Sequence, residues 1–134
     1  MTNNIHLHKN DLPDDLKLGN IIAVDGEFMG LNVRRDPLCL IQVSSGNSDA
    51  HIVQFDRDNY SAPNLIKLLN DKNVTKIFHY ARFDIGVLHR NLNFMTQNIY
   101  CTKIASKIGR TFSQSHGLKN LVKEILSIDI SKEQ

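Results

Sequence analysis

The sequence predicts one α/β domain, spanning residues 1–134, in which a mixed sheet carries helices on its faces. The first half of the chain has three apolar runs that are rich in β-branched residues and joined by short links, which is typical of antiparallel strands. In the second half, apolar residues at helical spacing alternate with further short apolar runs. A length of 134 residues suits one domain with a core of its own.

The strands of the first half are identified by their composition and by the turns between them. We expect a short strand at residues 5–8, followed by a three-stranded antiparallel meander at residues 20–28, 38–45 and 50–56. The segment GNSDA, which separates the last two strands, has the composition of a hairpin turn.

The helical period begins near residue 61. Ser61 is the predicted N-cap of a helix that has Pro63 in its first turn. Leu65, Leu68 and Leu69 form the apolar stripe of that helix. The remaining elements are predicted as strand 74–80, helix 81–93, strand 98–101, helix 102–110 and helix 116–127.

The composition, with 41% hydrophobic and 22% charged residues, is that of an ordinary soluble globular protein. The chain has no apolar run long enough to span a bilayer and no signal-peptide pattern, so we expect no membrane association. Two cysteines, Cys39 and Cys101, are too few for a disulfide framework and favour a cytoplasmic setting. A net charge of +2 permits a nucleic-acid partner without arguing for one.

Two acidic residues stand at the end of the apolar run 20–28. Side chains two positions apart share one face of a strand, so Asp25 and Glu27 point the same way, roughly 6–7 Å apart. Two like charges at that spacing repel unless a cation lies between them. Oxygen ligands suit Mg²⁺ or Mn²⁺ better than Zn²⁺. The alternative is a strand end that has reached solvent.

A third acid, Asp84, falls in the first turns of the predicted helix 81–93, among the apolar residues Phe83, Ile85 and Val87. The helix macrodipole favours an acid near a helix N-terminus, which would account for Asp84 alone. It does not account for two strands of one sheet that both run into carboxylates.

The segments around these acids resemble the DEDD superfamily of 3′–5′ exonucleases, which have a ribonuclease-H-like fold. AVDGEFMGL is similar to their first motif and FHYARFDIGVL to their second. NIYCTKIASKIGRTFSQSHGLKNLVKEIL resembles the helical segment between the second and third motifs of the ribonuclease D branch. The similarity runs from about residue 5 to the end of the chain. It is greatest to the short, single-domain bacterial members known as nanoRNase C.

The resemblance implies that Asp25, Glu27 and Asp84 are catalytic residues that bind two divalent cations, Mg²⁺ or Mn²⁺, about 4 Å apart. It further implies hydrolysis of RNA ends or short oligoribonucleotides to nucleoside monophosphates, and it leaves the preference between RNA and DNA open. Close relatives assemble as rings, so a homo-oligomer is expected. Gly26 departs from the family, which often has Thr at this position, and glycine weakens a strand.

Three apolar residues that follow the first two acids are candidates for substrate contact. The resemblance implies that Phe28, Met29 and Leu31 wedge against the terminal bases, a mode of binding that tolerates any sequence. Packing into the core is the alternative for all three.

Three basic or titratable residues are further candidates for substrate contact. His79 lies at a strand end and would contact the substrate or support the acids, although packing is the favoured alternative. Lys103 and Arg110 lie with Lys107 at helical spacing and would follow a phosphate backbone. A solvated helix face is the alternative for these basic residues.

The family also requires a fourth carboxylate, in a Tyr-x-x-x-Asp or His-x-x-x-x-Asp pattern. Neither pattern occurs after the second motif, where the late acids are Glu124, Asp129 and Glu133. We therefore expect residues 1–134 to correspond to the N-terminal two-thirds of an exonuclease domain, incomplete at its C-terminus and with the third motif absent. Such a chain would have low activity or none. Replacement of the fourth acid by Asp129 is a less favoured alternative.

Two hypotheses of function remain. The first is a metal-dependent 3′–5′ exonuclease, and the second is a catalytically impaired remnant that acts as a nucleic-acid-binding module. A third interpretation, an α/β domain whose acids are accidental, is disfavoured by the two motifs at strand ends. Binding of a divalent cation separates the first two hypotheses from the third, and hydrolysis separates the first from the second.

Overall fold

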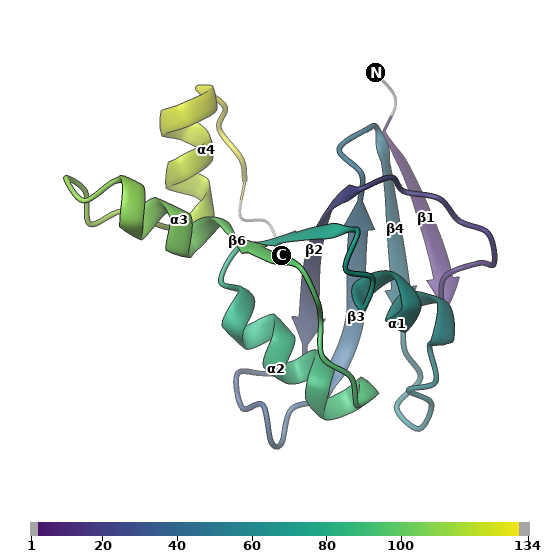
Figure 1. Ribbon diagram of the computed structural model, residues 1–134. Helices are drawn as coiled ribbons and strands as arrows, with labels where there is room; N and C mark the ends of the chain where they lie inside the picture. Colours follow the sequence, from purple (N-terminus) through teal and green to yellow (C-terminus); the bar gives the residue numbers. More distant parts are fainter. Residues whose placement is uncertain (1–2, 132–134) are drawn as a thin grey trace.

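The computed structural model describes residues 3–131 and confirms the mixed sheet (Figure 1). Its six strands lie in the order β1-β4-β3-β2-β5-β6. They are β1 (Asn4–Lys9), β2 (Ile21–Phe28), β3 (Leu38–Ser44), β4 (Asp49–Gln54), β5 (Thr75–Phe78) and β6 (Ile99–Cys101). The meander β2-β3-β4 is antiparallel as predicted. Parallel strands extend it at both ends: β1 pairs with β4 at one end, and β5 pairs with β2 and β6 with β5 at the other.

The helices are α1 (Pro63–Leu69), α2 (Ala81–Leu92), α3 (Thr102–Gly109) and α4 (Leu118–Leu126). The predicted N-cap of α1 was wrong: Ala62 occupies the cap position, and Ser61 precedes it. Asp11, in the loop between β1 and β2, caps the helix instead by accepting the N–H groups of Asn64 and Leu65 at 3.0 and 2.9 Å. One carboxylate thus satisfies two of the free amides that every helix has at its start.

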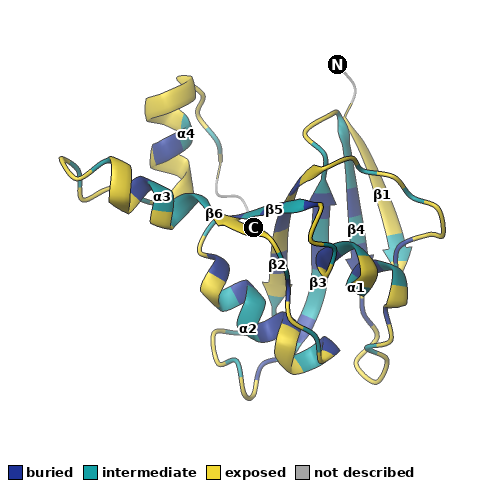
Figure 2. Ribbon diagram, viewed as in Figure 1, coloured by how far each residue is buried: buried dark blue, intermediate teal, exposed yellow. Residues whose placement is uncertain are grey.

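The hydrophobic core lies on one face of the sheet, where α1 and α2 cover it (Figure 2). Alternating residues of the strands point toward this face, as Ile22 and Val24 do from β2. The opposing helices contribute leucines and a valine that are fully buried, namely Leu65, Leu69, Val87 and Leu88. This packing holds β2 and α2, the two elements that carry the predicted acids, in a fixed relation.

The opposite face of the sheet is largely open. Ile5 and Leu7 of β1 are 70% and 65% exposed, and Ile21 of β2 is 58% exposed. The start of α4, at Leu118, borders this face. Asp25 and Glu27 project from the open side, so the predicted site faces solvent.

The C-terminal arm, residues 102–131, projects from the β6 edge of the sheet (Figure 1). A groove of about 360 Å³ lies between α3 and α4 and is lined mostly by apolar side chains, among them Leu121, Val122 and Ile125. Cys39 and Cys101 are free thiols, as expected. No helix within residues 3–131 is both long and apolar enough to cross a membrane.

Candidate active site

Strand alternation sets the direction of the acids on β2. Ile22, Val24 and Gly26 point into the core, whereas Asp25 and Glu27 point to the open face and are exposed. Strand β5 pairs with β2 only from Ile21 to Ala23. Beyond that point, no strand within residues 3–131 pairs with this edge of β2.

Asp84 fills the place that β5 leaves. The Gly26 N–H donates a hydrogen bond to Asp84 Oδ1 at 3.2 Å, and the Asp84 side chain is buried. Asp84 reaches this position because α2 begins within three residues of the end of β5, after a left-handed turn at Tyr80 with φ of 67°. The structure thus brings the acid of the second motif to the end of the strand that carries the first two.

Gly26 leaves room for this close approach. A Cβ atom at position 26 would lie 2.6 Å from the Phe28 ring and 3.1 Å from Asp84 Oδ1. A side chain there would displace the Phe28 ring and crowd the carboxylate. Sequence reasoning treated Gly26 as a weakness of the strand, and its role in admitting Asp84 becomes visible only in three dimensions.

The site concentrates negative charge. Burial, and then the charge of Asp25, raises the pKa of Asp84 to about 7, with a smaller contribution from Glu27. Desolvation raises the pKa of Asp25 as well, against the opposing effects of the Gly26 N–H and His79. Both shifts mean that burial disfavours the ionised carboxylates, and a neighbouring cation would offset this.

The chemistry of the site fits a hard divalent cation. Within residues 3–131, no three His, Cys, Asp or Glu side chains converge closely enough to complete a metal centre by themselves. Asp25, Glu27 and Asp84 nevertheless offer oxygen ligands only, which is the set that Mg²⁺ and Mn²⁺ prefer. A cation beside them would supply the charge that the raised pKa values of Asp25 and Asp84 indicate is missing.

A cleft of about 410 Å³ lies beside Asp25 on the open face. His79 lines it, and its Nδ1 lies 2.9 Å from the Thr102 hydroxyl, which itself donates to the Phe78 carbonyl at 3.1 Å. The Thr102 oxygen therefore accepts the Nδ1–H, and the His79 ring also interacts with the backbone of His116. Burial, and then the charge of Lys103, lowers the pKa of His79 and favours the neutral ring. Sequence reasoning missed Thr102, although a hydroxyl at a helix start was an available signal.

The three apolar candidates after the acids separate in the structure. Phe28 packs against the core and makes an edge-to-face contact with Phe83 at 5.0 Å between ring centroids. Met29 and Leu31 are 55% and 88% exposed. Core packing therefore accounts for Phe28, whereas Met29 and Leu31 remain available for contact with a ligand.

The two basic candidates also differ. The Nζ atom of Lys103 lies 4.3 Å from the centroid of the Tyr80 ring, and its charge acts on His79, so it lies beside the cleft. Arg110 instead donates to Ser106 Oγ at 3.1 Å and the Ser115 carbonyl at 3.0 Å, and forms an ion pair with Glu124. The guanidinium of Arg110 is thus engaged within the arm, which favours a structural role.

The late acids are partnered outside the β2 site. Glu124 pairs with Arg110, and Asp129 lies 3.0 Å from Lys123 Nζ with its side chain 72% exposed. Glu133 lies outside the described residues. These contacts give no support to Asp129 as a replacement for the fourth carboxylate.

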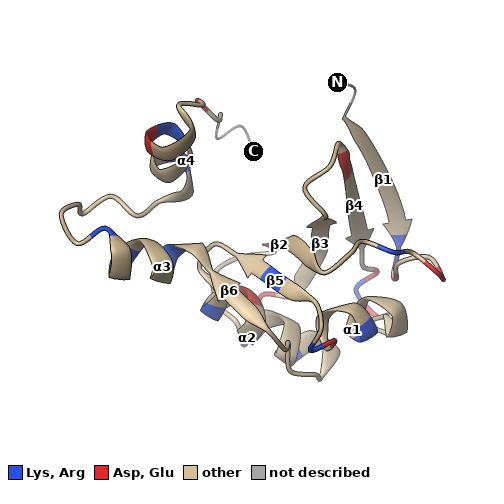
Figure 3. Ribbon diagram, turned by 45° about the horizontal axis from the view of Figure 1, so that its top comes forward, with Lys and Arg blue, Asp and Glu red and all other residues tan. Residues whose placement is uncertain are grey.

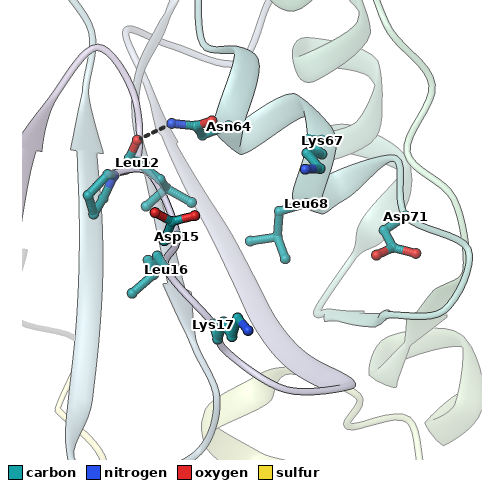
Figure 4. Close-up of a pocket in the computed structure, with 9 residues that line it drawn as sticks. Leu12, Asp15, Leu16, Lys17, Asn64, Lys67, Leu68 and Asp71 are labelled. Carbon is teal, nitrogen blue, oxygen red and sulfur yellow. Dashed lines mark hydrogen bonds between the residues drawn. The ribbon is translucent and has the colours of Figure 1, made fainter.

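A separate pocket of about 260 Å³ lies between the loop that follows β1 and helix α1 (Figure 4). Asn64 closes one side of it by donating to the Leu12 carbonyl at 2.9 Å. None of the predicted site residues lines this pocket, so it is distinct from the carboxylate site.

Comparison with solved structures identifies the same fold in known nucleases. NrnC of Brucella melitensis bound to pGG is 45% identical to this chain, with a TM-score of 0.93 over 98% of this chain and 65% of that one. NrnC with bound Mg²⁺ gives a TM-score of 0.92, also at 45% identity, over 98% of this chain and 66% of that one. Escherichia coli ribonuclease D is 27% identical, with a TM-score of 0.65 over 84% of this chain and 29% of that one.

Comparison with protein families and with curated sequences points to the same group of nucleases. Ribonuclease D of Zymomonas mobilis is 28% identical over 117 residues, which are 87% of this chain and 30% of that protein. The chain thus spans about two-thirds of the NrnC chains and less than a third of ribonuclease D. The predicted ribonuclease-H-like architecture and the resemblance to the ribonuclease D branch are confirmed. Because the 3′–5′ exonuclease family model matches residues 8–134, the chain belongs to the 3′–5′ exonuclease family.

Proposed function

We propose that this chain carries the metal-binding site of a divalent-metal-dependent 3′–5′ exonuclease that hydrolyses RNA ends or short oligoribonucleotides to nucleoside monophosphates. The observation that carries this proposal is the position of Asp84. It is buried against the unpaired edge of β2 and held by the Gly26 N–H beside Asp25 and Glu27. A buried carboxylate next to two others is costly to fold, which argues for a function of the cluster.

Each acid has a distinct part in holding the cations. Asp25 and Glu27 would bind from the open face of β2, and Asp84 from the strand edge, where its carboxylate is fixed by the Gly26 N–H. Two Mg²⁺ or Mn²⁺ ions held there would supply an activated water and would neutralise charge at the phosphodiester. The buried setting of Asp84 keeps its carboxylate in one orientation, so little reorganisation is needed when a ligand arrives.

The cleft beside Asp25 is proposed to receive the 3′ end of the substrate. Gln42, Ser44 and His79 line it and would offer polar contacts to the terminal nucleotide. Lysines on α3 and α4 lie along the arm that borders the cleft (Figure 3), where they would attract the phosphate backbone. NrnC has been solved with pGG, which supports a short oligonucleotide as the ligand here.

A nucleic-acid-binding module without hydrolysis is the second candidate function. It is favoured by the incomplete convergence of the acids, since no three ligating side chains within residues 3–131 form a metal centre alone. Such a module would bind the cations weakly and hold the oligonucleotide without cleaving it.

Cleavage of 5′-labelled pGG and of a longer 5′-labelled RNA, with Mg²⁺ or Mn²⁺, tests the first candidate. The chain is compared with Asp25→Ala and with Asp56→Ala, a matched change at an acid that pairs with Lys9 away from the site. Stepwise shortening from the 3′ end, abolished only in Asp25→Ala, is the expected result. Binding without cleavage would favour the second candidate, and cleavage that survives Asp25→Ala would contradict the proposed site.

A further inference from the structure

The loop of residues 29–37 carries an unusual exposed leucine. It joins β2 to β3 directly after the acids, and Leu31 within it is 88% exposed. The loop is closed at its base, where the Met29 N–H donates to the Pro37 carbonyl at 3.0 Å. It is fixed to the body of the protein by Val33, which packs against the core.

Asp36 holds this loop from the inside. Its side chain is only 9% exposed, although it carries a charge. Asp36 Oδ2 accepts the Asn32 N–H at 2.9 Å, and Arg35 donates to both carboxylate oxygens at 2.7 and 3.1 Å. These bonds lower the pKa of Asp36, so the carboxylate is ionised at neutral pH.

Gly30 allows the Asp36 carboxylate to lie close to the backbone next to Leu31. A Cβ atom at position 30 would be 2.3 Å from Asp36 Oδ2, well inside contact distance. The backbone on the other side of Leu31 is fixed by Asn32, whose carbonyl accepts the N–H groups of Arg35 and Asp36 at 3.1 and 2.7 Å. Of the two residues that flank Leu31, Asn32 is held by hydrogen bonds with Asp36, and Gly30 leaves room for the Asp36 carboxylate.

We propose that Asp36 is a positioning residue that holds Leu31 in a preformed orientation for contact with the 3′-terminal bases of the substrate. This inference rests on the proposed function. A loop that is ordered before binding avoids the entropy that a mobile loop would lose on contact. An apolar side chain on such a loop acts on any base, because every base offers an apolar face.

The test is a double-mutant cycle in which the measured quantity is the affinity for an oligonucleotide. Affinity is measured with Mn²⁺, which accepts a sulfur ligand, for 5′-labelled pGG whose internucleotide linkage is a hydrolysis-resistant phosphorothioate. Leu31→Ala and Asp36→Ala are each expected to weaken binding by about tenfold, and the double variant no further. Asp56→Ala, which removes an acid paired with Lys9 and Asn10, is the matched control. Independent effects that multiply to about a hundredfold in the double variant, or wild-type affinity of Asp36→Ala, would overturn the proposal.

Two further measurements keep the outcome clear. Asp36→Asn preserves the side-chain volume and replaces Asp36→Ala if the latter does not fold, with the same expected coupling to Leu31. If the parent chain itself does not bind the probe, the proposed function fails, and amide hydrogen exchange then judges Asp36 separately. Exchange at residues 30–34 should quicken in Asp36→Ala, and unchanged exchange there would refute the positioning role.

Discussion

The sheet with α1 and α2 differs sharply from the C-terminal arm. On the sheet side, the side chains of Ile41, Val53 and Leu88 are fully buried. In the arm, Ile108, Phe112 and Ile125 are 74%, 78% and 64% exposed, and its helices are tied together largely by polar contacts (Figure 2). The carboxylates depend on the first region, because β2 and α2 both belong to it.

This difference assigns separate tasks to the two regions. Apolar packing on the covered face fixes the relation between β2 and α2, and therefore the position of Asp84 beside Asp25. The arm contributes Thr102 and Leu118 to the border of the cleft. We therefore expect changes in the core to act on stability and changes in the arm to act on the substrate side of the cleft.

The largest effect is expected from a matched pair of truncations in the two regions. Leu88→Ala opens a cavity in the core and should lower the free energy of unfolding by roughly 2–5 kcal/mol. Ile125→Ala removes a side chain that is 64% exposed and should cost less than about 1 kcal/mol. Urea unfolding monitored by circular dichroism measures both, and equal losses would abolish the distinction between the regions.

Asp84→Asn tests the charge that is buried in the first region, between β2 and α2. Burial raises the pKa of Asp84 to about 7, above its ordinary value of 3.8, so ionisation of this group opposes folding and the penalty grows as the pH rises between these values. At pH 8 without metal, the variant should be more stable by roughly 2 kcal/mol. Thermal unfolding in EDTA should show a higher Tm for the variant and, with Mg²⁺, a smaller upward shift than in the parent chain. A lower Tm in EDTA would contradict this account of the site.

Arg110→Ala tests the polar contacts that hold the arm. The change removes donors to Ser106 and the Ser115 carbonyl and leaves Glu124 unpaired. A loss of about 1 kcal/mol is expected, with faster amide exchange in α4 and unchanged exchange in α2. Lys123→Ala, which removes an exposed ion pair with Asp129, is the control and should change little. Loss of oligonucleotide binding without faster exchange would instead indicate a direct phosphate contact by Arg110.

The smallest effect is expected at the edge of the sheet, where His6 and His8 of β1 stack on His51 of β4. Burial lowers the pKa of His51, helped by His6 and His8 and opposed by Asp49. Because the folded pKa lies below the ordinary value of 6.5, protonation favours unfolding, and stability should fall as the pH drops through that value. His51→Gln should flatten the dependence of Tm on pH between 7 and 5, whereas His89→Gln, an exposed change on α2, should not. If the dependence of Tm on pH is unchanged in His51→Gln, His51 is not the cause of that dependence.

Much of the fold was predictable because it is encoded in local periodicity. Alternation in residues 20–28 predicted both the strand and the shared direction of Asp25 and Glu27. The parallel pairing of β1 with β4 was not predictable, since it joins segments whose sequences carry no sign of each other. The cap of α1 by Asp11 was not predictable for the same reason, because Asp11 lies far from Asn64 in the chain.

Only part of the candidate site was likewise predictable from the sequence. The second motif indicated Asp84, but the unpaired edge of β2 that receives it arises from where β5 stops. Gly26 and Asp36 act through close approaches between side chain and backbone, which no spacing rule reveals. Phe28 and Arg110 were proposed for substrate contact. In the structure, Phe28 packs edge to face against Phe83, and Arg110 forms an ion pair with Glu124. The sequence pattern does not reveal these partners.

Binding of Mn²⁺, followed by electron paramagnetic resonance, tests most directly whether Asp25, Glu27 and Asp84 form one cation site. The parent chain is titrated beside Asp25→Asn, Asp84→Asn and Asp56→Asn, the last being an exposed acid away from the site. The account predicts bound Mn²⁺ in the parent chain and in Asp56→Asn, and strongly weakened binding in the other two variants. Equal binding in all four proteins, or none in the parent chain, would contradict it.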